Sequence, residues 1–161
     1  MTNTRSADKN GLHPVLIDIE NLVATPSPTR EAVEMAICAL REVVPGFDDS
    51  QRIVACSHHA ASTVAFAFPT ARHLWRSGRD GADLALLGVL ENERVDERFE
   101  RVTICSGDGI FAESAAWLAK AGIEVAAVSL AGHLAARLEL AARQVSLLPL
   151  AVSPGMTGSA S

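Results

Sequence analysis

Residues 101–109 read Arg-Val-Thr-Ile-Cys-Ser-Gly-Asp-Gly, an apolar run followed at once by a glycine-rich turn. A short apolar run of this kind is typical of a strand that is buried in a parallel sheet. The turn predicts entry into a helix that runs to about residue 121 and that Gly122 ends. A second apolar run follows at residues 123–130, so this part of the chain predicts a strand, a helix and a strand in succession.

The same alternation extends along the rest of the chain. Thr29 is a predicted N-cap of a helix, and Pro45 with Gly46 is the predicted stop of that helix. Strands separated by helices indicate βαβ units with right-handed crossovers. We therefore predict an α/β fold with a central, mainly parallel sheet of five or six strands. The predicted strands are residues 13–19, 52–57, 71–76, 101–105, 123–130 and 145–150, and the predicted helices are residues 30–44, 58–67, 83–94, 110–121 and 131–142.

The composition suits one domain of this class. The chain has 161 residues, of which 48% are hydrophobic and 20% are charged, and these values exclude a disordered chain and predict a sizeable core. The apolar runs are too short to cross a bilayer and the N-terminal residues carry no apolar signal region, so we expect a cytoplasmic protein without membrane contact. The expected boundaries are a polar arm at residues 1–12, a domain at residues 13–150 and a small-residue tail at residues 151–161.

The formal net charge of −5 argues against a general electrostatic attraction to nucleic acid. A metal-dependent nuclease is not excluded, because it concentrates carboxylates and the cation that they hold reverses the local charge. One local group of basic residues consists of Arg72, His73, Arg76 and Arg79.

Two acidic residues follow predicted strands directly. Asp18 lies near the end of the first predicted strand, and Asp108 lies in the turn after residues 101–105. Ligands of parallel sheets bind beyond the carboxyl ends of the strands, so both side chains are candidate site residues. Each also has a structural interpretation, because Asp caps turns and helix starts, and both interpretations stay open.

A third candidate is the segment Gly-Arg-Asp-Gly-Ala-Asp at residues 78–83, which opens a predicted helix. Asp80 and Asp83 lie three positions apart, so they project in the same direction if the first turn includes both. The helix dipole also favours acids at this position, which is the structural alternative. We favour the structural role for Asp80, and for Asp83 both roles stay open.

Together the three segments resemble the NYN domain, a family of the PIN-like nuclease superfamily. The likeness rests on Asp-x-x-Asn after the first strand, Gly-Ala-Asp at a helix start and Ser-Gly-Asp-Gly-x-Phe after a later strand, and it covers about residues 13–130. It implies a PIN-like three-layer α/β fold in which the first and fourth strands are adjacent. It also implies a ribonuclease that uses Mg²⁺ or Mn²⁺ and acts on RNA.

The resemblance also assigns roles to residues. Asp18, Asp83 and Asp108 match the family's metal-binding acids, and hard cations prefer such oxygen ligands. Asn21 matches the family's asparagine, which helps to position metal or phosphate, and it completes the catalytic set with the three acids. Ser106 matches the serine whose hydroxyl steadies a ligand.

Two positions depart from the family's pattern. Ile110 stands where the family commonly has a second acid, two residues after Asp108, and Ile19 replaces a glycine. A site that lacks one carboxylate is expected to bind metal more weakly or to hold only one ion. The alternative function is therefore a catalytically impaired RNA-binding or protein-interaction module. Candidates to replace the missing acid are Glu20, Asp80 and Glu113.

Basic and aromatic residues supply the candidate substrate contacts. Arg76 and Arg79 precede the Gly-Ala-Asp segment and are the best candidates for contacts with backbone phosphates. His58 follows a predicted strand and is expected at the same edge, although a solvated helix start is the competing interpretation. We expect Trp75 and Phe111 to pack in the core rather than to stack on bases.

The sequence disfavours a nucleotide-binding Rossmann enzyme, because neither G-x-G-x-x-G nor G-x-x-x-x-G-K-[ST] occurs in it. The partner that the NYN resemblance implies is RNA. A single PIN-like domain offers only a shallow basic surface, so a homodimer that builds a longer groove is also compatible with the resemblance. The apolar last helix, which contains Leu134 and Leu138, is a candidate either for the monomer core or for such an interface.

Overall fold

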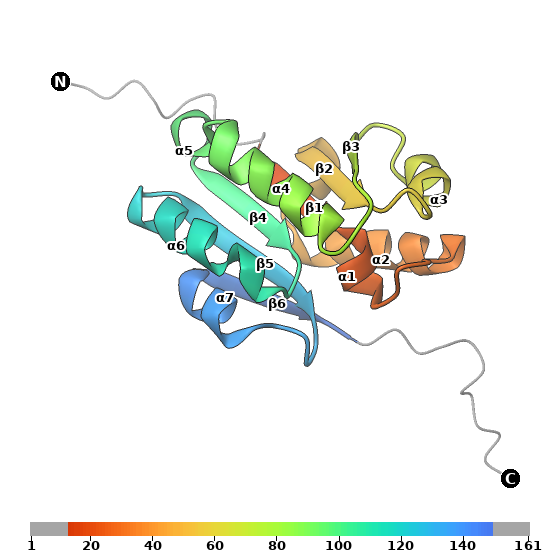
Figure 1. Ribbon diagram of the computed structural model, residues 1–161. Coiled ribbons are helices and arrows are strands. Elements are labelled where there is room, and N and C mark those ends of the chain that lie inside the picture. Colours follow the sequence, from red (N-terminus) through yellow and green to blue (C-terminus); the bar gives the residue numbers. More distant parts are fainter. Residues whose placement is uncertain (1–12, 150–161) are drawn as a thin grey trace, which may run out of the picture.

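The apolar runs between residues 13 and 149, the part of the chain that the computed structural model describes, form one sheet (Figure 1). Its strands are β1 (Pro14–Asp18), β2 (Gln51–Cys56), β3 (Arg72–Trp75), β4 (Arg101–Cys105), β5 (Glu124–Leu130) and β6 (Gln144–Leu148). All neighbouring strands are parallel, in the order β3-β2-β1-β4-β5-β6. The predicted α/β class is confirmed, and the sheet is parallel throughout.

Two layers of helices cover the sheet. They are α1 (Ile19–Val23), α2 (Arg30–Val43), α3 (Ala61–Ala67), α4 (Gly81–Asn92), α5 (Val95–Arg98), α6 (Ala112–Lys120) and α7 (Ala136–Ala141), with 3-10 turns η1 (Phe47–Asp49) and η2 (Gly109–Phe111). The first three helices pack on one face and the last four on the other (Figure 1). In β1, Val15 and Ile17 contribute to the first core and Leu16 to the second. Because side chains alternate along a strand, β1 needs apolar residues on both faces to be buried between the two helix layers, and Asp18 at its end is the exception.

The two cores bury large side chains completely. Phe111 is fully buried in the second core, as the sequence predicts. Leu138 is also fully buried there and Leu134 packs against the same cluster, so the last helix belongs to the core of the monomer. Burying a side chain such as Phe111 stabilises the fold by about 1.5–3 kcal/mol.

The structure corrects several predicted boundaries. The helix predicted at residues 58–67 begins at Ala61, because residues 57–60 form a turn and the N-cap residue, Ala60, has no side chain that can accept a hydrogen bond. The helix predicted at residues 131–142 is confined to α7, because the chain first makes a turn in which Gly132 has φ +80°. The short helices α1 and α5 were not predicted.

Trp75 was predicted to pack in the core, and this prediction is wrong. Its side chain is 51% exposed, because β3 is an edge strand with a neighbour on one side only. The predicted arm at residues 1–12 and the predicted tail at residues 151–161 lie outside the described residues. Between residues 13 and 149, no helix has the length and apolar character needed to cross a membrane.

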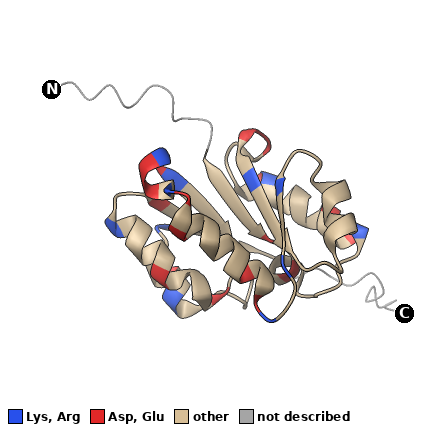
Figure 2. Cartoon of the chain, turned by 45° about the horizontal axis from the view of Figure 1, so that its top comes forward, with Lys and Arg blue, Asp and Glu red and all other residues tan. Residues whose placement is uncertain are grey.

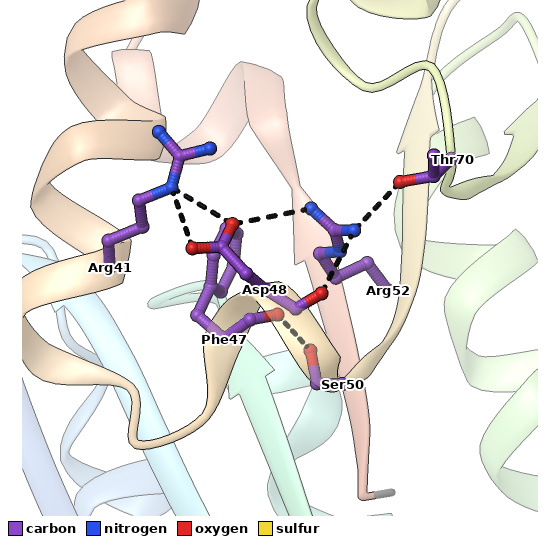
Figure 3. A network of polar contacts seen from close by, with 6 residues as sticks. All are labelled: Arg41, Phe47, Asp48, Ser50, Arg52 and Thr70. Carbon is purple, nitrogen blue, oxygen red and sulfur yellow. Dashed lines mark hydrogen bonds and ion pairs between the residues drawn. The ribbon is translucent and has the colours of Figure 1, made fainter.

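The connection from α2 to β2 is held by a network of polar contacts at the amino-terminal edge of the sheet (Figure 3). The Asp48 carboxylate accepts a hydrogen bond of 2.9 Å from Arg41. Arg52 donates to the Thr70 hydroxyl at 2.8 Å, and its guanidinium lies over the Phe47 ring at 5.4 Å from the ring centre. Both arginines are therefore committed to structural contacts.

Candidate functional site

The centre of the sheet contains a topological switch point, the kind of position at which open α/β sheets bind ligands. β1 and β4 are neighbours, yet the chain leaves β1 toward the helices of one face and leaves β4 toward the helices of the other. A reversal of this kind opens a crevice beyond the carboxyl ends of the two strands, which is where open α/β sheets bind ligands. Asp18 ends β1, and Asp108 lies three positions after the end of β4.

The buried pair Asp18 and Asp83 occupies this edge. Their side chains are only 4% and 7% exposed and are hydrogen-bonded to each other. One oxygen of Asp18 also accepts the Asn21 N–H at 3.2 Å, which caps α1. The Oδ1 atom of Asp83 is buried and has no hydrogen-bond partner among the described residues.

The first turn of α4 reaches the strand ends because Gly81 lacks a side chain. A methyl group at Gly81 would lie 2.3 Å from the carbonyl oxygen of Arg76, a distance that no side chain tolerates. The preceding residue, Asp80, adopts the left-handed conformation with φ +56° and starts the helix abruptly. These two positions bring Asp83 to Asp18.

Burial raises the pKa of both carboxyl groups. For Asp83, burial has the largest effect and the adjacent Asp18 adds to it, and together they raise the pKa of Asp83 to about 9. The hydrogen bond from Asp83 partly offsets the effect of burial on the pKa of Asp18. The charge of Asp108 raises the pKa of both groups further. The pair therefore retains a proton at neutral pH.

Asp108 is engaged in capping rather than paired with the other acids. Its carboxylate accepts the N–H of Ile110 at 2.9 Å and so caps η2. Ser106 is fully buried and its hydroxyl accepts the Asp108 N–H at 3.2 Å, so it holds the turn, and a contact with substrate stays a prediction. Within residues 13–149, no three His, Cys, Asp or Glu side chains form a group that could hold a metal ion.

Asn21 links the loops that follow β1 and β4. Its side-chain oxygen accepts the Gly107 N–H at 3.0 Å, and the Gly107 carbonyl accepts the Ala135 N–H at 2.8 Å. A methyl group at Gly107 would lie 2.2 Å from the carbonyl oxygen of His133, so only glycine allows this close approach. Three strand-to-helix loops are thus fixed to one another at the candidate site.

A cleft of about 210 Å³ opens beside the acid pair. Besides Asp18 and Asp83, it is lined by Glu20, Asp80 and Arg76. Glu20 is fixed in place, because its carboxylate accepts hydrogen bonds from the hydroxyl of Ser57 at 2.6 Å and from the N–H of Ser57 at 3.2 Å. The contact between Glu20 and Ser57 joins residues 37 positions apart, so no local sequence pattern predicts it.

The remaining candidates lie outside the walls of this cleft. Arg79 is exposed in the connection from β3 to α4. His58 is exposed after β2 and is in contact with the Ser77 hydroxyl. Glu113, one of the acids considered for the position of Ile110, lies in a separate groove between α4 and α6. The structure therefore leaves Glu20 and Asp80 as the additional acids of this site.

No protein-family model matches the sequence, and no curated protein matches it. The chain is similar in structure to a Vibrio parahaemolyticus protein of unknown function, with a TM-score of 0.58 and 15% identity over 89% of this chain and 96% of that one. It is also similar to YcaC from Pseudomonas aeruginosa, crystallised with hexane-2,5-diol and covalent acrylamide, with a TM-score of 0.51 and 15% identity over 91% of this chain and 81% of that one. At this identity the similarity concerns the α/β fold alone.

Proposed function

We propose that this chain is a cytoplasmic, metal-dependent ribonuclease of the NYN type, which hydrolyses RNA phosphodiester bonds with Mg²⁺ or Mn²⁺. The observation that carries the proposal is the buried Asp83 oxygen without a partner, beside the buried Asp18, at the edge of the sheet where ligands bind. Two buried carboxyl groups side by side destabilise a fold, and a cation between them offsets that cost. The three NYN-like motifs give independent support.

The donor atoms suit a hard cation. Mg²⁺ prefers oxygen ligands and is commonly held by one or two protein carboxylates, with waters and substrate phosphates completing its shell. Asp18 and Asp83 would hold the ion, and Asp108 would add a further carboxylate from the β4 side only after its side chain leaves the Ile110 N–H that it now caps. When bound, the ion supplies an activated water and stabilises charge on the leaving oxygen of a phosphodiester.

Other residues of the site orient the substrate. Arg76 lines the cleft, and a guanidinium there matches the charge of a backbone phosphate. Asn21 keeps the loops after β1 and β4 in register through Gly107. Glu20, held by Ser57, supplies the additional acid in place of the one that the family has at the position of Ile110.

The test is cleavage of a labelled single-stranded RNA in Mn²⁺ by Asp18→Asn and by a matched control, Glu113→Gln. Asp18→Asn should cleave RNA more slowly by a factor on the order of 100 or more, the loss expected when a catalytic group is removed. A thermal unfolding measurement should show that the variant still folds. Glu113→Gln removes the same charge outside the cleft and should cleave at the normal rate. Equal cleavage by Asp18→Asn and the unmodified protein would show that the site is wrongly assigned.

The alternative is an RNA-binding module that does not cleave. It is favoured by Ile110, which replaces an acid, and by the commitment of Asp108 to the Ile110 N–H. Calorimetric titration with Mn²⁺ separates the two functions. Stoichiometric binding that Asp108→Ala weakens supports the nuclease, whereas RNA binding that is unchanged by chelator, without any metal binding, supports the module.

A further inference from the structure

The arginines of the described chain fall into two groups by their partners. Lys and Arg are spread over the chain rather than gathered on one element (Figure 2), and most arginines are paired. Arg72, for example, makes two 2.7 Å hydrogen bonds to Glu93, and Arg41 and Arg52 share Asp48 (Figure 3). The guanidinium groups with no hydrogen bond or ion pair to any residue between 13 and 149 belong to Arg76, Arg79, Arg137 and Arg143.

Three of these four free cations lie at the edge of the sheet that carries the acid pair. Arg76 and Arg79 follow β3 directly, and Arg137 is in the first turn of α7, just after the loop that follows β5. Arg143 lies at the opposite edge of the sheet, where its backbone N–H donates to the carbonyl of Val125 near the start of β5. Arg76 shares its cleft with four carboxylates, and Arg137 lies beside the turn that carries Asp108, yet neither guanidinium forms an ion pair with a described residue. Their N–H groups are therefore available to the phosphates of a substrate that reaches these acids.

The backbone that carries Arg137 is held beside the site. The start of α7 is tied to the β4 loop by the hydrogen bond from Ala135 to Gly107. A methyl group at Gly109, the residue after Asp108, would lie 3.3 Å from Nη2 of Arg137. Arg137 therefore flanks the acids on the β4 side, while Arg76 flanks them on the β3 side.

We propose that Arg137 binds a backbone phosphate of the RNA on the opposite side of the acid pair from Arg76. β3 and β4 are three strand spacings apart, roughly 14 Å, which exceeds the reach of a single phosphate. Arg76 and Arg137 would therefore contact different phosphates of the bound RNA. This inference rests on the proposed ribonuclease function.

The contact is tested by the salt dependence of binding, with no cleavage involved. A fluorescent single-stranded uridine 12-mer is titrated in EDTA with Arg137→Gln and with Arg143→Gln, which makes the same charge change at the opposite edge. Losing one phosphate contact on a single strand should lower the slope of log K against log salt by about 0.7. We expect this loss for Arg137→Gln and no change for Arg143→Gln. Equal slopes for the two variants overturn the inference.

The two proposals fail separately. If Asp18→Asn still cleaves, the assigned metal site is wrong while the Arg137 contact can stand, whereas the absence of any RNA binding by the unmodified protein refutes both.

Discussion

Replacing Asp83 by Asn should remove much of the pH dependence of stability between about pH 4 and pH 9. The pKa of Asp83 is 3.8 when unperturbed and about 9 in the fold, because burial and the neighbouring Asp18 disfavour its charged form. Between these values the folded state holds a proton that the unfolded state has released. Stability from this group is therefore complete below its unfolded pKa and decreases as the pH rises toward the folded pKa.

One such proton changes the free energy of unfolding by about 1.4 kcal/mol per pH unit. Across three pH units, the unmodified protein should lose up to about 4 kcal/mol relative to Asp83→Asn. This value is the maximum for a pair that shares one proton. The Asn side chain stays neutral and can donate to the Asp18 carboxylate at every pH, so the variant should be the more stable protein under alkaline conditions.

Urea unfolding in EDTA, repeated at each unit between pH 5 and pH 8, measures the difference without metal. The control is Glu113→Gln, which makes the same charge change on an exposed residue outside the cleft. The unfolding free energy of that variant should follow the same pH dependence as the unmodified protein. Parallel pH curves for Asp83→Asn and the unmodified protein would refute the shared proton.

Three further predictions concern packing, and one concerns metal. Gly107→Ala should lower the unfolding temperature, because the added methyl group would lie 2.2 Å from a carbonyl oxygen of the β5–α7 loop. Gly88→Ala, within α4, should stabilise by about 0.5–1 kcal/mol in urea unfolding, because the added methyl group would meet only the Asn92 side chain, at an ordinary contact distance of 4.0 Å. Phe111→Ala should cost about 3–5 kcal/mol in the same assay, and Phe66→Ala, at an exposed position, much less. Ile110→Asp should tighten Mn²⁺ binding measured by calorimetry, and unchanged affinity would count against the proposed site.

The sheet was predictable because a strand that is buried on both faces appears in the sequence as a short, continuous apolar run. β1, β4 and β5 are short apolar runs, and each is bounded by polar or glycine-containing segments. The exposure of Trp75 was not predictable, because the segment itself does not reveal that β3 lies at the edge of the sheet. The start of α3 was missed for a related reason, since Ala60 offers no capping side chain as a signal.

The candidate site was predictable in part. The adjacency of Asp18 and Asp83 follows from their positions at a strand end and at a helix start, which meet at one edge. The capping role of Asp108 was one of the two interpretations that its turn allowed, and the hydrogen bond from the Ile110 N–H shows that Asp108 adopts it. The contact between Glu20 and Ser57 joins two loops far apart in the chain, and no local pattern encodes it.

The hydrogen bond from Gly107 to Asn21 also bears on how the protein folds. It joins residues 86 positions apart, so it forms only after the chain has closed a very long loop. The segment of chain that connects β1 to β2 is much shorter than the one that connects β1 to β4, so β1 can pair with β2 before β4 pairs with the other side of β1. Contacts of high sequence separation are slow to form. During synthesis and refolding, the acid pair is therefore exposed to solvent on its β4 side until the two halves of the sheet have met.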